Sequence, residues 1–304
     1  MKQISSIIML LAFAGCDASV DFPSRDFTYY LASPSPMKLV EVLSGKRNDE
    51  RREIVSQALL ATGVSHTRQP FWHDNIRGEN IVVEIGSGSK AVVIATHFDR
   101  AVDSPGSNDN ASCLAAAIIG LGGLRADPPD NVRAVFLFSD LEETALAGSR
   151  HFVANIELSD VYGAVSFDLC GIGNAVGIWD VRGGMAESPV MRALIEASEQ
   201  ESVYYSTHGP VARFSSDHRS FAEKGVVGVG VTIVPRADET KLRAYVDNPN
   251  SIRWLIKSLL PRIFRTYHLP TDTPLTLDAA ALDLAQRIMV RTIRALDASV
   301  APTS

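Results

Sequence analysis

The chain has 304 residues, of which 46% are hydrophobic and 21% are charged. This composition is that of a globular protein and excludes a disordered, collagen-like or coiled-coil chain, and the length allows one large domain or two smaller ones. The formal net charge of −6 argues against nucleic acid as a partner, because binding to a polyanion requires a basic surface. Three cysteines are too few for a disulfide framework.

An apolar run near the N-terminus resembles an export signal. The run covers residues 4–13 and is too short to cross a bilayer, which requires about 20 residues. It ends in Phe13-Ala14-Gly15-Cys16, which resembles a bacterial lipoprotein signal, cut before a cysteine that then receives lipid. We therefore expect residues 1–15 to be a signal peptide and Cys16 to anchor the chain to the membrane, on the exported side of the bacterial cell envelope. An ordinary secretory signal cut nearby is the alternative.

Residues 16–35 contain two prolines and show no clear periodicity, so we interpret them as a tether to a domain over residues 36–300. Two further cysteines, Cys113 and Cys170, lie in this domain. We expect two buried small apolar side chains. A disulfide is the alternative in an exported protein, because their separation cannot be derived from the sequence.

From about residue 36 onward, predicted strands and helices alternate. Short runs rich in Val, Ile and Phe predict buried strands at residues 80–85, 91–95, 132–138, 161–167 and 226–233. Helical patterns occupy residues 51–60, 111–124, 145–155, 189–201, 217–224 and 278–296, and Gly63 is a plausible stop for the first of them. The mixed charges at residues 46–53 are assigned to a solvated helix face. This alternation predicts one three-layer α/β domain with a mixed, mostly parallel sheet flanked by helices.

Imidazoles and carboxylates follow several of the predicted strands. His97 and Asp99 come after the strand at 91–95, Glu142 and Glu143 after 132–138, and Asp168 after 161–167. Sites in open α/β sheets form at the carboxyl ends of strands. Imidazole and carboxylate are the usual ligands of zinc, and carboxylates can bridge two ions. The pattern therefore indicates a metal site.

Three other chemistries fit the sequence poorly. A Gly-x-Ser-x-Gly elbow typical of serine hydrolases is absent from the sequence. Cys113, in an apolar helix, has no local signature of a catalytic thiol. The glycine-rich residues 171–177 have the wrong spacing for a dinucleotide-binding loop and do not lead into an obvious helix.

The motifs taken together resemble a known family. They are His97-x-Asp99, Gly106-x-x-Asp109-Asn110-Ala111-Ser112, Glu142-Glu143, Asp168, Ser216-Asp217-His218 and Tyr267-His268-x-Pro270-x-Asp272-Thr273. In this order they resemble the exported zinc aminopeptidases of metallopeptidase clan MH, which also contains glutaminyl cyclases and glutamate carboxypeptidases. The resemblance covers roughly residues 36–300.

The resemblance implies a site with two Zn²⁺ ions per chain. One ion would be held by His97 and Asp168, the other by Glu143 and His268, and Asp109 would bridge them. Catalytic roles would fall to Glu142, as the general base, and to Asp99, which would orient the ring of His97.

Four further residues complete the implied site. Asp217 and His218 are expected to form a helix start and a pocket wall, without a role in metal binding. Tyr267 and Asp272 are expected beside the pocket, with Asp272 holding the loop that presents His268. Cys113 stands where the family usually has Gly, which we expect to narrow the pocket.

The segment over residues 235–266 is longer than the family commonly has. Basic and apolar residues alternate at 253–257 and 259–265. We expect a packed helix or a lid beside the active site, because Pro261 interrupts the pattern. The alternative is a segment suited to a membrane surface.

The sequence therefore predicts an exported, lipid-anchored, metal-dependent aminopeptidase that acts on peptides. One alternative is a glutaminyl-peptide cyclotransferase that uses one zinc ion, which releases ammonia rather than an amino acid. The other is a non-catalytic peptide-binding lipoprotein, which the presence of every expected ligand and of the base disfavours.

Overall fold

The computed structural model describes residues 22–211 and 214–300, and the predicted signal peptide and Cys16 lie outside them. Within the described residues the centre of the molecule is an eight-stranded sheet with the order β1-β2-β4-β3-β5-β8-β6-β7. The strands are β1 (Thr67–His73), β2 (Ile76–Ile85), β3 (Lys90–His97), β4 (Val132–Ser139), β5 (Val161–Phe167), β6 (Ala175–Trp179), β7 (Tyr205–Thr207) and β8 (Gly228–Val234).

The middle of the sheet is parallel and places several strand ends at one edge. Strand β3 pairs in parallel with β4 and β5, and β5 pairs in parallel with β8. Antiparallel pairs join β1 to β2, β2 to β4 and β6 to β8. His97 and Ser139 are register partners at the ends of β3 and β4, so the residues that follow these strands begin at the same edge.

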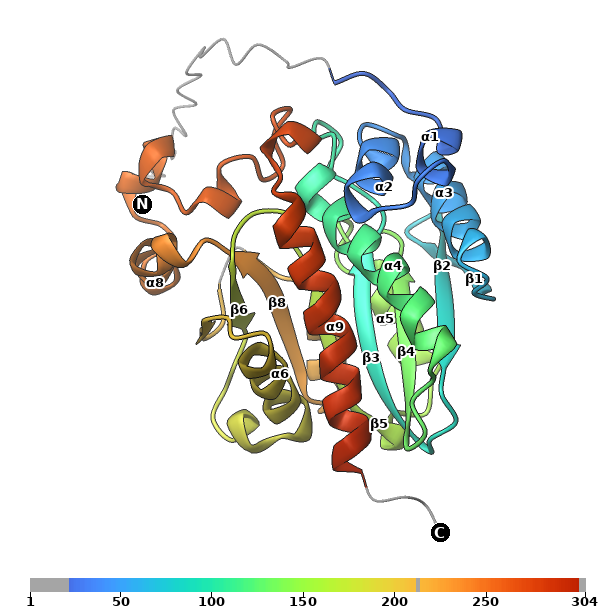
Figure 1. Cartoon of the computed structure of the whole chain (residues 1–304). Coiled ribbons are helices and arrows are strands. Elements are labelled where there is room, and N and C mark those ends of the chain that lie inside the picture. The colour runs from blue at the N-terminus through green and yellow to red at the C-terminus, as the bar shows by residue number, and fades with distance from the viewer. Residues whose placement is uncertain (1–21, 212–213, 301–304) are drawn as a thin grey trace, which may run out of the picture.

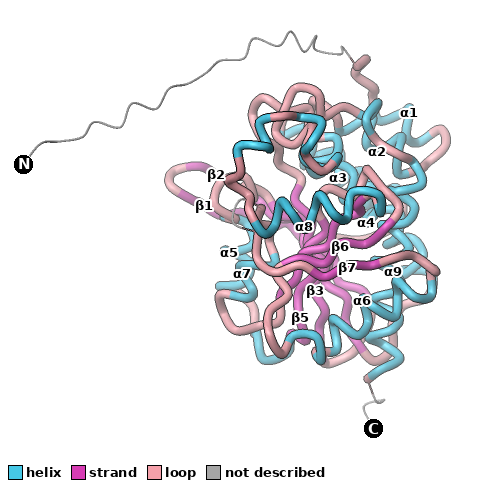
Figure 2. The backbone as a smooth tube through the Cα atoms, turned by 90° about the vertical axis from the view of Figure 1, so that its left-hand side faces the viewer, coloured by secondary structure: helices cyan, strands magenta, loops and turns pink. Residues whose placement is uncertain are grey.

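Helices cover both faces of the sheet (Figures 1 and 2). The helices are α1 (Phe27–Leu31), α2 (Pro36–Leu43), α3 (Asn48–Ala61), α4 (Ser112–Ala126), α5 (Ala147–Ala154), α6 (Pro189–Gln200), α7 (His218–Ala222), α8 (Glu239–Asp247) and α9 (Ala279–Ser299). Buried side chains of α2, α3, α4, α6 and α9 pack on one face, and those of α5 and α7 pack on the other.

Alternation along β3 explains the two cores. Val92 and Ile94 join the larger apolar cluster, whereas Ala91, Val93 and Ala95 join the smaller one. Successive side chains of a strand point to opposite faces, so a continuous apolar run is required where both faces are covered. The predicted three-layer α/β fold is confirmed.

Among the described residues, three strands and two helices were not predicted. Strand β7 has only three residues, β6 lies in the glycine-rich stretch, and β1 is an edge strand that contains Pro70. The unpredicted helices are α1 and α2, whereas α8 lies in the segment 235–266, for which a packed helix or a lid was expected. Helix α1 lies within the predicted tether, and its Tyr30 is buried in the larger cluster, so the folded part of the chain begins earlier than residue 36.

The buried residues of the described core all follow the predicted signal peptide. Buried members of the four apolar clusters run from Tyr30 to Leu296. A chain that begins at residue 17 therefore contains the whole described core. Among the described residues, no helix is long and apolar enough to cross a membrane.

Candidate metal centre

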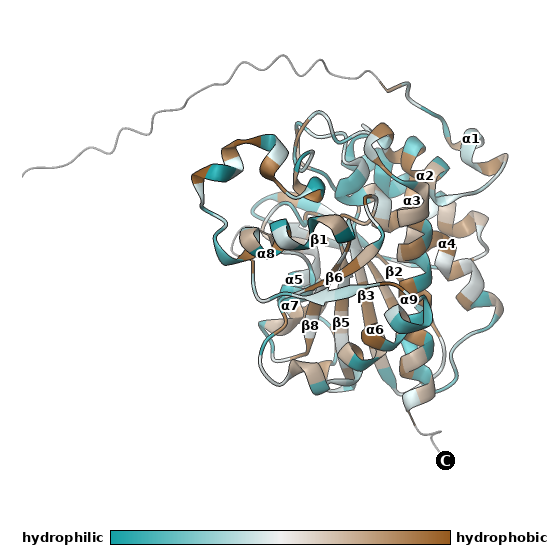
Figure 3. Ribbon diagram, turned by 60° about the vertical axis from the view of Figure 1, so that its left-hand side comes forward, coloured by the Kyte–Doolittle hydropathy of each residue, from teal (hydrophilic) through white to brown (hydrophobic). Residues whose placement is uncertain are grey.

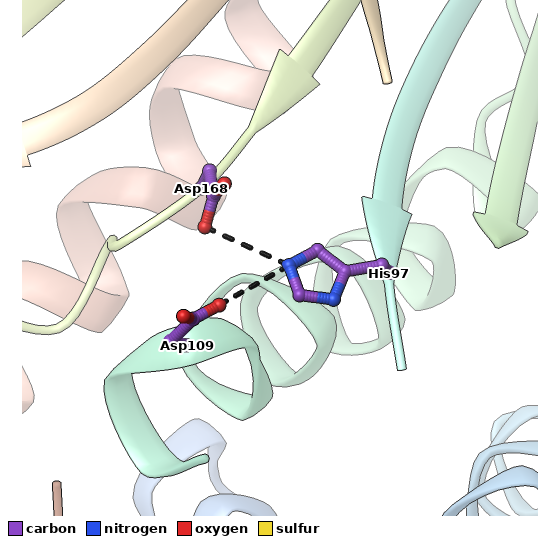
Figure 4. Close-up of side chains that lie close together, drawn as sticks. All are labelled: His97, Asp109 and Asp168. Carbon is purple, nitrogen blue, oxygen red and sulfur yellow. Dashed lines mark ion pairs between the residues drawn. The ribbon is translucent and has the colours of Figure 1, made fainter. Parts of the chain in front are cut away.

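Three side chains converge at the carboxyl edge of the sheet. His97 is the last residue of β3, Asp168 directly follows β5, and Asp109 lies in the turn η1 (Ser107–Ala111) before α4. The Nε2 atom of His97 lies 3.2 Å from Oδ1 of Asp109 and 3.8 Å from Oδ1 of Asp168 (Figure 4). All three side chains are buried.

Asp109 also belongs to a second group. Its other carboxylate oxygen, Oδ2, lies 3.2 Å from Nε2 of His268, and the same nitrogen lies 3.0 Å from Oε2 of Glu143. Within each group the candidate ligand atoms all lie within 4.8 Å of one another. The structure therefore brings together the five residues predicted as metal ligands, in two groups that share Asp109.

Asp99 connects the loops after β3 and β4. Nδ1 of His97 lies 3.1 Å from the carbonyl oxygen of Asp99 and 3.3 Å from its Oδ1. The backbone N–H groups of Glu142 and Glu143 donate to the two carboxylate oxygens of Asp99, both at 3.1 Å. The contact with His97 was expected, whereas the hydrogen bonds to the Glu pair were not. Asp99 thus orients an imidazole and the backbone of the neighbouring loop.

Glu142 lies beside the two groups without belonging to either. It is 8% exposed, and it sits in a series of bends and turns after β4. Burial raises the pKa of Glu142 well above 4.5; His97 opposes this increase and Asp217 reinforces it. A buried carboxylate with a raised pKa is suited to accept a proton near neutral pH.

The surrounding carboxylates favour positive charge between the two groups. Burial alone lowers the pKa of His97, but Glu142, Asp109 and neighbouring carboxylates raise it well above 6.5. His268 behaves in the same way: Asp109 and Glu143 outweigh burial and raise its pKa to about 10. A cation placed between these groups displaces protons from the imidazoles and meets the same electrostatic preference.

The donor set fits a divalent metal. Within the described part of the chain, four buried atoms of these groups make no hydrogen bond of suitable geometry: Asp109 Oδ2, Glu143 Oε1, Asp168 Oδ1 and His268 Nε2. This holds although Asp109 Oδ2 and His268 Nε2 lie 3.2 Å apart. Unpaired buried polar atoms are costly in free energy, and coordination to an ion offsets that cost. A mixture of imidazole and carboxylate suits zinc and can also bind cobalt or manganese.

Asp272 links the His268 loop to the turn that contains Asp109. Its Oδ1 accepts a hydrogen bond from the backbone N–H of Asn108 at 2.8 Å, and its Oδ2 accepts one from that of Asp109 at 3.2 Å. The expectation concerned only the loop that presents His268. The side chain instead holds the neighbouring turn, so Asp272 sets the position of both loops relative to each other.

A disulfide links the Asp109 turn to the Asp168 loop. Cys113 and Cys170 are bonded, with their Cα atoms 5.4 Å apart, so the expectation of two unpaired cysteines was wrong. Beside the disulfide, the N–H of Cys170 donates to Oγ of Ser112 at 3.0 Å, and the N–H of Gly171 donates to Oδ1 of Asn108 at 2.8 Å. The loops that present two of the candidate ligands are therefore joined covalently.

Arg51 is a charged residue near the site that the sequence analysis missed. It was assigned to a solvated face, yet it is fully buried, and its Nη2 donates to the carbonyl oxygen of Gly106 at 3.2 Å. Burial lowers the pKa of Arg51 to about 10, so the side chain stays charged at neutral pH. The available signal was its spacing of four and eight residues from Val55 and Leu59, which places all three on one helix face.

Asp217 and His218 belong to networks outside the two groups. Oγ of Ser139 donates to Asp217 at 2.5 Å. The ring of His218 bonds Ser166 at 2.6 Å and Asp180 at 2.8 Å. Asp217 does precede α7, as expected, but the buried ring of His218 is not the wall of an open pocket. Ser166 is fully buried, so this Ser-His-Asp arrangement is closed to a substrate.

Tyr267 supports the second group. Its ring stacks on that of His268 with centroids 3.8 Å apart. The edges of Phe214 and Phe264 pack against Tyr267, both with centroids 6.2 Å away. The aromatic cluster thereby orients the His268 imidazole, which is 38% exposed.

The mixed sheet carries two groups of candidate metal ligands at its carboxyl edge. Residues 80–293 match the model of peptidase family M28, and the chain belongs to this family.

An aminopeptidase of Pseudomonas aeruginosa is 28% identical over 169 residues, which are 50% of this chain and 30% of that protein. The chain thus spans about a third of the length of that relative. A zinc aminopeptidase from Bacillus subtilis superposes with a TM-score of 0.59 at 20% identity, over 76% of this chain and 52% of the other. A glutaminyl cyclase from an Acidobacteriales bacterium superposes with a TM-score of 0.64 at 17% identity, over 92% and 98% of the two chains.

Proposed function

We propose that the protein is an aminopeptidase that removes N-terminal residues from peptides with two Zn²⁺ ions and Glu142 as the general base. The observation that supports this most is the pair of His-carboxylate groups that share Asp109. A single-metal site needs only one such group. Family membership and the aminopeptidase relatives agree with this proposal.

The roles of the chain's own residues follow from their positions. When bound, the metal ions supply Lewis acidity toward the scissile carbonyl and the attacking water. Glu142 accepts a proton from that water and passes it to the departing amine. Asp99 keeps Nε2 of His97 directed at the site and holds the loop that contains Glu142.

Metal analysis and product analysis test this proposal together. We expect residues 17–304 to bind about two zinc ions per chain and to hydrolyse an aminoacyl-anilide panel. Asp109→Asn removes the shared ligand, so we expect it to lose most of the metal and the activity. Asp103→Asn, an exposed residue of the neighbouring loop, serves as the control and should keep both.

The same assay separates the alternatives. One zinc ion per chain, with release of ammonia from peptides that begin with Gln and no hydrolysis, identifies a glutaminyl cyclotransferase. Absence of metal and of both reactions identifies a binding protein. Either result overturns the aminopeptidase proposal.

We further propose that the chain is exported and attached to the membrane of the bacterial cell envelope by lipid on Cys16. The motif ending at Cys16 supports this. We expect the chain expressed in bacteria to partition into the detergent phase of a phase-separating detergent and to incorporate labelled fatty acid. Cys16→Ser should stay in the aqueous phase, and detergent partition of this variant would contradict the anchor.

A further inference from the structure

A segment after α8 combines exposed apolar side chains with basic charge. Residues 248–271 contain Arg253, Lys257, Arg262 and Arg265 but no Asp or Glu, in a chain whose formal net charge is −6. Hydrophobic and hydrophilic stretches alternate along the ribbon that follows α8 and projects from the molecule (Figure 3). The formal charge of this stretch, which Asp247 and Asp272 flank, is therefore opposite in sign to that of the whole chain, although Arg262 lies 4.0 Å from Asp278.

The aliphatic side chains of this segment face outward. Ile252, Leu255 and Ile256 are 81%, 79% and 56% exposed, whereas Trp254 between them is 8% exposed. The indole N–H of Trp254 donates to the carbonyl oxygen of Asn248 at 2.7 Å. Because Trp254 anchors the turn, its neighbours are held in the solvent rather than exposed by fraying.

The turn is fastened to the protein through an aromatic cluster. The ring of Trp254 packs edge-on against Tyr245 of α8, with centroids 5.3 Å apart, and Tyr245 stacks on Phe264 at 4.7 Å. Phe264 in turn contacts Tyr267 beside the candidate site. The aromatic cluster thus holds the base of the segment, while its outward aliphatic group stays in the solvent.

The described chain begins near the loop that carries His268. Phe22, the first described residue, lines a cavity of about 330 Å³ together with Val102 and Pro270, and Pro270 lies two residues after His268. Five residues lie between Cys16 and Phe22, and the six extended residue steps from one to the other reach at most about 20 Å. A lipid on Cys16 would therefore hold this rim of the molecule close to the bilayer.

We propose that residues 252–257 dock the protein on an anionic membrane surface. Ile252, Leu255 and Ile256 enter the boundary between headgroups and acyl chains, and Arg253 and Lys257 contact lipid phosphates. Burial of aliphatic side chains and attraction of basic side chains to anionic lipid act together in interfacial binding. The surface itself depends neither on the proposed peptidase activity nor on the proposed anchor.

Vesicle binding tests this surface without lipid on Cys16. Residues 17–304 are mixed with vesicles of phosphatidylglycerol and phosphatidylcholine, or of phosphatidylcholine alone, and sedimented. We expect binding only to the anionic vesicles, and binding that decreases as salt increases. Arg253→Glu with Lys257→Glu should weaken it by about 30-fold or more. Arg192→Glu with Lys224→Glu makes the same change in net charge at exposed positions elsewhere. This control should weaken vesicle binding much less.

A second variant tests the aliphatic contribution. Ile252→Ser with Leu255→Ser should weaken vesicle binding while leaving the thermal midpoint unchanged, because both side chains are exposed. The proposal is overturned if the native chain does not bind anionic vesicles. It is also overturned if the variant with Arg253→Glu and Lys257→Glu binds them as tightly as the native chain does. If these variants instead change kcat/KM for a small soluble substrate without vesicles, the segment is a lid. If the native chain and all variants lack peptidase activity, the vesicle-binding result still stands. The docking proposal and the aminopeptidase proposal can therefore fail independently.

Discussion

Replacing Glu142 by Gln is expected to lower kcat for peptide hydrolysis by about 10³-fold, within the range that general-base catalysis contributes. Gln keeps the size of the side chain but cannot accept a proton at neutral pH. Burial raises the pKa of Glu142 well above 4.5, so the native carboxylate is a stronger base than an exposed one. The measurement is kcat and KM on an aminoacyl-anilide, together with the zinc content of the variant.

The comparison with Glu143→Gln makes this result specific. Glu143 lies 3.0 Å from Nε2 of His268 and belongs to the second group of candidate ligands. We expect Glu143→Gln to lose metal, whereas Glu142→Gln keeps the metal and loses turnover. Both variants retain backbone N–H groups that donate to Asp99. A Glu142→Gln protein with metal and with activity within about tenfold of the native chain would exclude Glu142 as the base.

The candidate site was predictable because its residues follow buried strands. Apolar runs that end in His97 and Asp168 mark the ends of β3 and β5, and the parallel pairing of these strands places both residues at one edge. The expected ligand roles of all five residues came from the resemblance, and Asp109 and His268 also lie in irregular loops, whose positions no strand pattern predicts. Loop paths depend on contacts between distant segments, such as the hydrogen bonds from the Asp109 turn to Asp272.

The residues that sequence reasoning missed depend on tertiary packing. Arg51 lies in a charged stretch, and only its position on the apolar face of α3 distinguishes it from its solvated neighbours. Once buried beside Gly106, it stays charged next to an acidic site, where Asp99, Asp109 and Asp272 favour its charged form. A charge pattern describes the average solvation of a helix face, so it cannot identify the one residue that faces inward.

The edges of the sheet were missed for a different reason. Strand β1 is mostly polar and exposed, and strand β7 has only three residues. Neither contains the continuous apolar run of the central strands. An edge strand is covered on fewer sides, so it needs fewer apolar residues. The inner strands β2, β3, β4, β5 and β8 carry the stronger apolar pattern and were predicted. Strand β6 is also paired on both sides, but it is only five residues long, is interrupted by Gly177 and lies in the glycine-rich stretch, so it was missed.

Replacing both Cys113 and Cys170 by Ala is expected to destabilise the fold by about 4 kcal/mol, from the loop of 57 residues that the disulfide closes. At roughly 2–4 °C per kcal/mol for a domain of this size, the thermal midpoint should decrease by about 10 °C. Both positions are fully buried, so Ala is a better replacement than Ser. Thermal unfolding of the zinc-loaded proteins, with and without reductant, measures the effect.

The disulfide should also affect metal binding, because it joins the turn of Asp109 to the loop of Asp168. Without it, the hydrogen bonds from Cys170 and Gly171 to the neighbouring turn remain, so we expect weaker zinc binding rather than its loss. Reductant should shift the native midpoint toward that of the double variant and leave the variant unchanged. If the variant binds zinc as tightly as the native chain but unfolds earlier, the disulfide stabilises the fold alone. If neither property changes, the packing of α4 against the sheet is sufficient to hold the two loops together.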